Sequence, residues 1–195
     1  MKVVISVVSH YHFDLIKSLK CIGNLADKFD VFVIDNVKED GFEQWCEHSN
    51  INYLSNDKKI GFGENNNKVF QAAYKEGGGE DCWFLVLNPD VIVSPEDVLA
   101  LIYNMRSDNS RVATINLFRD EGFIKYDNSI RKFPSLTDFI KSYVTGNNPS
   151  VLDKDLIAQS MHVDWASGAF LMFDANLYAK LNGFDIRYYM YCEDI

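Results

Sequence analysis

The first hundred residues alternate short apolar runs with segments of helical spacing, and this alternation constrains the fold more than any other feature of the chain. Runs rich in β-branched and aromatic residues predict four buried strands, at Val3–Val8, Val31–Ile34, Ile51–Leu54 and Cys82–Leu87. Helices are predicted after each strand, at Phe13–Leu25, Phe42–His48, Glu64–Lys75 and Pro95–Arg106. Strands that are apolar on both faces need helices over both faces, so we predict an α/β fold with a Rossmann-like, mostly parallel sheet.

The pattern changes after Val112–Phe118, where helices no longer alternate regularly with apolar strands. The remaining predicted elements are a short antiparallel strand at Phe123–Tyr126, a helix at Leu136–Val144, a loop at Asn147–Ser150, a strand at Ala169–Phe173 and a helix at Asp174–Leu181. A length of 195 residues suits a single domain. We divide it into a first half, residues 1–118, and a second half, residues 119–195.

Charge and composition exclude several classes of protein. Lys and Arg number 19 against 28 Asp and Glu, which gives a formal net charge of −9 and argues against a nucleic-acid partner. No apolar run approaches the length that crosses a bilayer, and the N-terminus lacks the pattern of a secretory signal. The four cysteines form no Cys-x-x-Cys pair, which indicates a reduced, cytoplasmic setting without disulfides or a zinc site.

Polar residues follow three of the predicted strands, at the edge where the carboxyl ends of those strands meet. They are Ser9-His10, Asp35-Asn36 and Asn88-Pro89-Asp90. Ligands of parallel α/β sheets bind outside this edge, so the three groups together favour a site, although each alone could simply start a turn. Asp90 is the strongest candidate metal ligand, since one carboxylate with substrate phosphates and water commonly holds Mg²⁺ or Mn²⁺. A chain with a net charge of −9 also needs a cation to accept a pyrophosphate.

A glycine-containing segment, Gly61-Phe62-Gly63, precedes the four polar residues Glu64 to Asn67. The glycines permit close approach of a ligand to the backbone, and the asparagines offer donors and acceptors for a base or a sugar. The segment lacks the Lys-Ser/Thr of a phosphate-binding loop and the third glycine of the dinucleotide fingerprint, so ATP and NAD sites are disfavoured. A helix start with a capping asparagine remains the alternative.

The last residues place two adjacent carboxylates, Glu193 and Asp194, after the aromatic-rich run Tyr188–Tyr191. Such a pair suits a general base with a neighbour that orients or tunes it. A charged chain end is the alternative, and the residues alone favour it. The four histidines, at positions 10, 12, 48 and 162, have no metal-ligand spacing and are interpreted as structural or surface residues.

Taken together and in this order, the motifs resemble the family 2 inverting glycosyltransferases with the GT-A fold, and among them the bacterial rhamnosyltransferases of O-antigen and cell-wall assembly. The matching stretches are Val33–Asn36, Ile60–Asn67, Leu87–Asp90, Ser129–Ser135, Asp164–Ala169 and Gly183–Asp194. The resemblance covers the whole chain. It implies that residues 1–118 bind the nucleotide-sugar and that residues 119–195 bind the acceptor, with a small antiparallel element.

The resemblance also implies roles for individual residues. The implied donor-binding residues are Ser9, Asp35, Asn36, Gly61, Gly63, Asn66, Asn88 and Asp90. Asp90 is the implied metal ligand, because Asn88 occupies the first position of the family's Asp-x-Asp-type motif. The implied acceptor-binding residues are Trp165, Ser167 and Gly168. Asp194 is the implied catalytic base with Glu193 beside it, and Arg131 matches a recurrent position to which we assign no role.

The implied reaction moves L-rhamnose from dTDP-L-rhamnose, with inversion, onto a lipid-linked saccharide at the cytoplasmic face of the membrane. Another dTDP-sugar or a UDP-sugar is the alternative donor. The stretch Leu136–Val144 is amphipathic and could contact lipid at the membrane periphery. A core-facing helix is favoured there, because the stretch carries too few cations for strong attraction to a membrane surface.

Two other hypotheses stand beside this one. A nucleotidyltransferase needs a glycine-rich, basic loop after its first strand, where this chain has Ser9–His12. Members of the resembled family continue for several tens of residues past the Glu-Asp pair, whereas this sequence ends at Ile195 and therefore resembles a fragment or a truncated form. An inactive remnant that only binds nucleotide is thus the second alternative.

Overall fold

The computed structural model describes residues 1–74, 79–120, 122–133, 135, 137, 142–143, 146, 152, 154–157 and 159–189. These residues form two compact units. The first unit contains the described residues of 1–113 and 168–189, and the second contains those of 114–167. The predicted functional division at residue 118 stays a prediction, while residues 168–189 return to the first unit.

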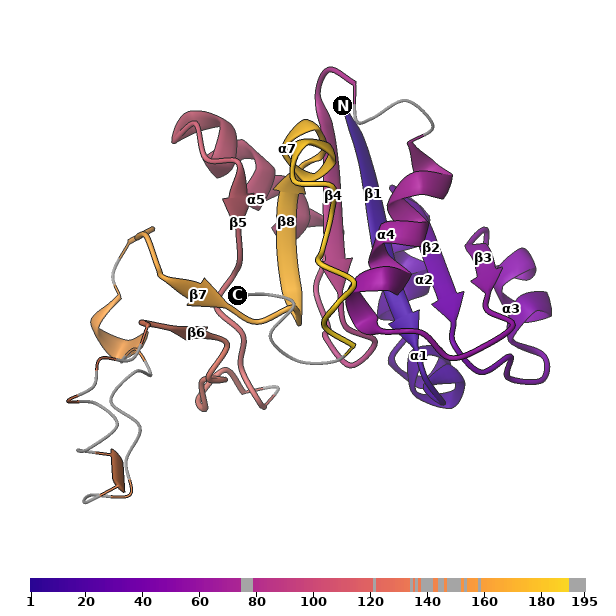
Figure 1. The fold of residues 1–195 in the computed structure, drawn as a ribbon, viewed down its shortest axis with the longest axis horizontal. Helices are drawn as coiled ribbons and strands as arrows, with labels where there is room; N and C mark the ends of the chain where they lie inside the picture. The colour runs from indigo at the N-terminus through magenta and orange to yellow at the C-terminus, as the bar shows by residue number, and fades with distance from the viewer. Residues whose placement is uncertain are drawn as a thin grey trace. The chain divides into compact units, whose positions relative to one another are not determined.

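A six-stranded sheet in the order β3-β2-β1-β4-β8-β5 forms the centre of the first unit (Figure 1). Its strands are β1 Lys2–Ser9, β2 Asp30–Asp35, β3 Asn52–Ser55, β4 Cys82–Leu87, β5 Val112–Ala113 and β8 Phe170–Asp174. The four neighbours from β3 to β4 are parallel, and β8 pairs antiparallel with both β4 and β5. The predicted mostly parallel α/β fold is confirmed.

Helices cover both faces of this sheet, with α4 and α7 on one side and α2 and α5 on the other (Figure 1). The helices are α1 Phe13–Leu19, α2 Cys21–Ala26, α3 Phe42–His48, α4 Phe62–Ala73, α5 Pro95–Ser107 and α7 Ala175–Lys180. The predicted continuous helix over Phe13–Leu25 is wrong, because Lys20 adopts a left-handed φ of 58° that ends α1 and begins α2.

The start of α5 follows the prediction closely. The Ser94 side chain accepts a hydrogen bond from the backbone N–H of Asp97, and the Asp97 carboxylate accepts one from the backbone N–H of Ser94. This reciprocal capping box satisfies two backbone donors that the helix cannot satisfy itself, and Pro95 supplies the fixed φ of the first turn.

Aromatic packing joins α4 and α7 to the centre of the sheet. The buried ring of Tyr178 on α7 lies 4.7 Å from both Phe70 of α4 and Phe84 of β4, centroid to centroid. Burial of each such ring contributes about 1.5–3 kcal/mol to stability. These ring contacts hold α4 and α7 against the sheet.

The second unit contains a two-stranded antiparallel sheet of β6 Ile130–Arg131 and β7 Trp165–Ala166, with the short helix η1 Lys154–Leu156. The strand predicted at Phe123–Tyr126 is wrong, apart from a single bridge between Phe118 and Tyr126. The Asp120 carboxylate accepts the N–H groups of residues 124 and 125 and folds this stretch into a turn.

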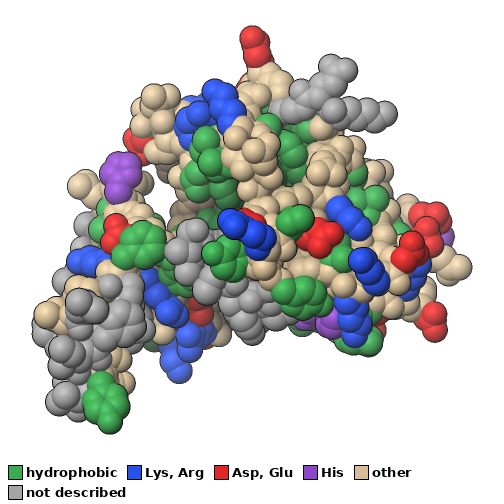
Figure 2. All heavy atoms as spheres, viewed as in Figure 1, with side chains coloured by type: hydrophobic (Ala, Val, Ile, Leu, Met, Phe, Trp, Pro, Cys, Tyr) green, Lys and Arg blue, Asp and Glu red, His purple; other side chains and the backbone are tan. Residues whose placement is uncertain are grey.

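Most of the helix predicted at Leu136–Val144, and the whole loop predicted at Asn147–Ser150, lie outside the described residues. No helix formed by the residues that the structure describes is both long and apolar enough to cross a bilayer. The described cysteines are free thiols, and burial raises the pKa of Cys46 to about 12. On the face shown in Figure 2, acidic, basic and apolar side chains are interspersed.

Candidate functional site

The candidate site begins at the edge of the sheet where β1, β2 and β4 end. The register pairs Ser9 with Asp35 and Val7 with Leu87, so the residues that follow the three strands lie side by side. The arrowheads of these strands mark the edge at the lower side of the sheet in Figure 1. The chain leaves β1 toward β2 on one side and places β4 on the other, which makes this edge a topological switch point where ligands of such sheets bind.

Asp35 is fully buried, and both of its carboxylate oxygens are hydrogen-bonded to protein. Oδ1 accepts the backbone N–H groups of Val37 and Lys38, each at 3.0 Å. Oδ2 accepts the backbone N–H of Glu39 at 2.6 Å and the hydroxyl of Tyr53 at 3.1 Å. In this conformation the carboxylate holds the loop after β2, and four donors fill its accepting positions.

Ser9 is connected to this loop through Glu39. The Ser9 hydroxyl donates to Glu39 Oε1 at 3.2 Å and accepts the backbone N–H of His12. The same carboxylate accepts the N–H of Phe13, the first residue of α1. A negative charge at a helix start is favourable, so Glu39 both caps α1 and ties β1 to the loop after β2.

Asn36 belongs to a buried chain of amide side chains. Its amide donates to the carbonyl of Ile60 at 2.9 Å, and its oxygen accepts the Ile60 N–H and the Asn56 amide. Asn56 also donates to Asn65 of α4 at 2.7 Å and accepts the ammonium of Lys68. This network fixes the loops after β2 and β3 to the start of α4, because a buried amide left unpaired is costly.

The two glycines of the predicted donor segment and Asn66 are buried. Asn66 accepts the hydroxyl of Ser6 at 2.6 Å and donates to the carbonyl of Phe62, so its side chain joins α4 to β1. A Cβ atom at Gly61 would lie 2.5 Å from the carbonyl oxygen of Tyr189. The backbone of Tyr189 therefore occupies the space beside Gly61 where a ligand was expected to approach. A role of these residues in binding a ligand stays a prediction.

The end of β4 presents a different environment. Asn88 is partly exposed and Asp90 is exposed, whereas Pro89 between them is buried. Within the part of the chain that the structure describes, neither the Asn88 side chain nor the Asp90 carboxylate forms a hydrogen bond or an ion pair. Asp90 is thus a carboxylate at the switch point with its accepting positions available.

The donor set at this position fits a divalent cation bound together with a substrate. An unpaired carboxylate and a neighbouring amide oxygen, completed by phosphate and water oxygens, match the hard oxygen ligands of Mg²⁺ and Mn²⁺. No group of three or more His, Cys, Asp or Glu residues that could hold a metal occurs among the described residues. The residues present therefore suit a cation that a substrate phosphate helps to bind.

The predicted acceptor residues divide between the two units. Gly168, in the first unit, is buried and adjoins Ala169, whose carbonyl accepts the N–H of Asn88 at 2.9 Å. In the second unit the Arg131 guanidinium lies 4.9 Å from the centre of the Trp165 ring, and Ser167 donates its N–H to the carbonyl of residue 129. Glu193 and Asp194 lie outside the described residues, so their roles stay predictions.

Three residues at the sheet edge were missed by sequence reasoning. Glu39 and Asn56 both bond the predicted residues, and Asn56 follows a strand as the selected residues do, so the same rule could have found it. Tyr11 is 67% exposed at a φ of 66°, and the Lys59 ammonium lies 5.3 Å from its ring. Sequence carries no signal for a tyrosine in this left-handed conformation, which is costly for a bulky residue.

Comparison with known proteins adds independent findings. The family model described as "Glycosyl transferase family 2" matches residues 14–176. The chain is 39% identical over 196 residues to Rhamnosyltransferase WbbL of Escherichia coli strain K12, a match that covers 99% of this chain and 74% of that protein.

Two further relatives are more distant. N-acetylglucosaminyl-diphospho-decaprenol L-rhamnosyltransferase of Mycobacterium tuberculosis is 30% identical over 180 residues, covering 85% of this chain and 58% of that protein. Low-salt glycan biosynthesis hexosyltransferase Agl10 of Haloferax volcanii is 25% identical over 183 residues, covering 92% of this chain and 56% of that protein. The chain thus spans less than two thirds of the length of these two relatives.

Proposed function

Because the chain belongs to glycosyl transferase family 2, we propose that it transfers L-rhamnose from dTDP-L-rhamnose, with inversion, to a lipid-linked saccharide. The names of two relatives support the sugar, since both are rhamnosyltransferases. The name of the mycobacterial relative supports a saccharide on a polyprenyl diphosphate as the acceptor. In this proposal the reaction serves polysaccharide synthesis such as O-antigen assembly, at the cytoplasmic face of the membrane.

The observation that carries the proposal is the free carboxylate of Asp90 at the switch point of the sheet. A buried polar group normally has its hydrogen bonds satisfied by other groups of the protein, as Asp35 does. Asp90 is exposed and has no partner within the described part of the chain, so it is available to a ligand. Asp90, with Asn88, would hold Mg²⁺ or Mn²⁺, which when bound would offset the negative charge of the leaving diphosphate.

The rest of the edge suits the nucleotide of the donor. The loop after β2 is held rigidly by Asp35, and the exposed ring of Tyr11 offers an aromatic face on which a base can stack. A preorganised loop loses little conformational entropy when the nucleotide binds. We therefore propose that Asp35, Asn36 and Ser9 hold in place the loops that surround the donor.

The proposed reaction is a single displacement at the anomeric carbon. A hydroxyl oxygen of the acceptor forms a bond to that carbon from the side opposite the diphosphate. The bond from the carbon to the diphosphate oxygen breaks, and the nucleoside diphosphate leaves with the electron pair. Asp194 accepts the hydroxyl proton, and Glu193 orients or tunes it. One base is sufficient, because the sugar carries oxocarbenium character in the transition state.

A transfer assay with radiolabelled dTDP-L-rhamnose and a polyprenyl-diphosphate saccharide tests this proposal. We expect Asp194→Asn to lower kcat by about 10²–10⁴-fold with little change in the KM for the donor. Asp14→Asn, at an exposed carboxylate in the first turn of α1, is the matched control and is expected to be unchanged. Near-normal transfer by Asp194→Asn would remove that residue from the mechanism.

Calorimetric titration with dTDP and UDP in the presence of Mn²⁺ identifies the donor class. Tighter binding of dTDP agrees with the proposed donor, and tighter binding of UDP favours a UDP-sugar. Binding of either nucleotide without any sugar transfer would favour the non-catalytic alternative.

A further inference from the structure

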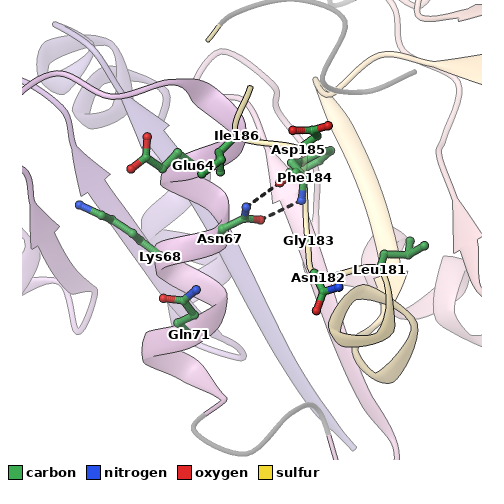
Figure 3. A pocket seen from close by; sticks show the side chains of 10 residues that line it. All are labelled: Glu64, Asn67, Lys68, Gln71, Leu181, Asn182, Gly183, Phe184, Asp185 and Ile186. Carbon is green, nitrogen blue, oxygen red and sulfur yellow. Dashed lines mark hydrogen bonds between the residues drawn. The ribbon is translucent and has the colours of Figure 1, made fainter. Parts of the chain in front are cut away.

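The open cavity shown in Figure 3 offers no free positive charge to a ligand. It has a volume of about 580 Å³ and lies between α4 and the segment Leu181–Ile186, which follows α7. Asn67 of α4 bonds both backbone groups of Phe184 across it. Lys68 is the only cation that lines the cavity, and its ammonium already donates to Asn56 at 2.9 Å. A cation without such a partner is found in the second unit instead.

Arg131 differs from the other four arginines of the chain, because each of those has a carboxylate partner. Arg106, Arg111, Arg119 and Arg187 each form an ion pair with an aspartate. Arg131 lies in β6, and no ion pair joins it to any residue that the structure describes. In a chain with a net charge of −9, a guanidinium without an acidic partner is available to an anionic ligand.

The Arg131 side chain is nevertheless held in one orientation. Its guanidinium lies 4.9 Å from the centre of the Trp165 ring, and its Nε donates to the carbonyl of Asn128 at 3.3 Å. Both Nη atoms remain without a protein partner among the described residues. Because the N–H groups of a guanidinium match two oxygens of a phosphate, Arg131 is a preorganised group for binding that anion.

The pairing of β6 with β7 explains why Arg131 reaches solvent. Arg131 lies directly opposite Trp165, and Ile130 lies directly opposite Ala166. Successive side chains of a strand point to opposite faces, so Arg131 and Trp165 share one face and Ile130 lies on the other. Ile130 is 7% exposed, whereas Arg131 and Trp165 are both partly exposed. Burial of the isoleucine therefore fixes the face on which the arginine meets a ligand.

Two residues next to Arg131 suit a diphosphate that is attached to a lipid. Lys132 is exposed and forms no ion pair or hydrogen bond within the described part of the chain, so it is a second available cation. Phe133 is 58% exposed, although its backbone N–H is bonded to the Asp164 carboxylate at 3.1 Å. A diphosphate carries more than one negative charge, and an exposed ring offers apolar surface to a prenyl chain.

We propose that Arg131, held on Trp165, binds the diphosphate of the lipid-linked acceptor, with Lys132 as a second cation and Phe133 against the prenyl chain. This inference rests on the proposed function above, in which the acceptor is a saccharide on a polyprenyl diphosphate. In that proposal the diphosphate of the donor is already neutralised by the cation at Asp90. Arg131 is therefore a binding residue for the acceptor and takes no part in the chemical step.

Equilibrium binding of farnesyl diphosphate to the whole chain, measured in EDTA, tests the inference without a transfer assay. EDTA removes divalent cations, so binding through a cation at Asp90 does not contribute. We expect Arg131→Met to weaken binding about ten- to a hundredfold, because the charged hydrogen bonds to phosphate are lost while methionine can still pack on Trp165. Farnesol, which lacks the diphosphate, should bind equally to the wild type and the variant.

Arg119→Met is the matched control, because Arg119 belongs to the same unit but already pairs with Asp127. It should leave the affinity for farnesyl diphosphate within about twofold of the wild type. Equal affinities in the wild type and Arg131→Met, or equal losses in Arg131→Met and Arg119→Met, would overturn the inference.

Arg131→Lys keeps the positive charge but loses the planar guanidinium. We expect an intermediate loss of affinity, about three- to tenfold, because an ammonium cannot bind two phosphate oxygens in the same way. This variant also decides the question if Arg131→Met does not fold. An affinity equal to that of the wild type would then contradict the assignment.

Steady-state kinetics distinguish the diphosphate of the acceptor from that of the donor. In Arg131→Met the KM for the polyprenyl-diphosphate saccharide should rise about tenfold or more. The KM for dTDP-L-rhamnose, and the affinity for dTDP in the presence of Mn²⁺, should stay within about twofold of the wild type. A loss of dTDP affinity with unchanged binding of farnesyl diphosphate would assign Arg131 to the donor and overturn the inference.

The two assays also separate failure of this inference from failure of the proposed function. If the wild type transfers no sugar, the proposed function fails, and the binding of farnesyl diphosphate still shows whether Arg131 recognises a prenyl diphosphate. If the wild type transfers sugar and Arg131→Met binds farnesyl diphosphate normally, only the inference fails.

Discussion

Asp35 is the last residue of β2 and Asp90 follows the end of β4, at the same edge of one sheet, yet their surroundings are opposite. Asp35 is fully buried and accepts three backbone N–H groups and one hydroxyl. Asp90 is exposed and has no partner in the described part of the chain. A carboxylate at this edge can thus either hold a loop of the protein in place or remain available to a ligand.

The loop that follows each strand decides which of these two roles applies. After β2 the chain turns back and directs the N–H groups of residues 37–39 at the carboxylate of Asp35. Beside Asp90 stands Pro89, which has no N–H, and the N–H of Val91 is used by the Asn88 carbonyl. Four substitutions test whether the two carboxylates have different roles, and they follow in order from the largest expected effect to the smallest.

Asp90→Ala is expected to have the largest effect, and the effect should be on activity alone. In the proposed mechanism Asp90 holds the cation that binds the donor, so loss of its carboxylate should lower kcat/KM for sugar transfer by about 10³-fold or more. The midpoint of thermal unfolding should stay within about 2 °C of the wild type, because an exposed, unpaired side chain contributes little to stability. A large fall in the unfolding midpoint would show that Asp90 is a framework residue like Asp35.

Asp35→Asn is expected to act mainly on stability. In the wild type, each oxygen of the carboxylate accepts a hydrogen bond from at least one backbone N–H. In the variant the amide NH₂ replaces one of these oxygens, so at least one buried N–H loses its acceptor. We expect the free energy of unfolding to fall by about 2–3 kcal/mol, measured by urea denaturation. Asp90→Asn is the control and should change it by less than about 0.5 kcal/mol. Unchanged stability in Asp35→Asn would remove the distinction between the two carboxylates.

Asn88→Asp sharpens the proposal for the end of β4. A second carboxylate beside Asp90 should favour a cation, because ligand charge raises the affinity of hard oxygen sites. We expect Mn²⁺, titrated in the presence of dTDP, to bind about tenfold more tightly. Weaker binding than in the wild type would indicate that Asn88 does not face the cation.

Tyr53→Phe should have the smallest effect. The variant loses the hydroxyl that donates to Asp35, at a cost of about 1 kcal/mol. Burial, the charge of Asp35 and this hydrogen bond raise the pKa of Tyr53 above its ordinary value. The unfolded chain therefore loses the tyrosine proton first, at about pH 10, while the folded protein retains it. The stability advantage of the wild type should be complete below about pH 10 and decline above it, as followed by denaturation of both proteins.

Much of the fold could be predicted because it depends on local patterns. The apolar runs of β1, β2 and β4 and the start of α5 at Pro95 were readable from a few adjacent residues. The break at Lys20 and the turn at Asp120 were not predicted, because each depends on a backbone conformation that no residue type there requires. The polar residues at the strand ends were found, but their contacts were not.

The order of residue types alone determined that the chain builds a mostly parallel sheet, that its strands end in polar groups, and that two glycines precede the three asparagines. Only the tertiary structure decided what each of these groups does. Asn65, Asn66 and Asn67 are adjacent and chemically identical, yet a helix turns successive side chains by about 100°. They therefore bond a neighbouring loop, the core strand and the segment after α7, respectively. That assignment depends on which elements pack around the helix, and these elements come from distant parts of the chain.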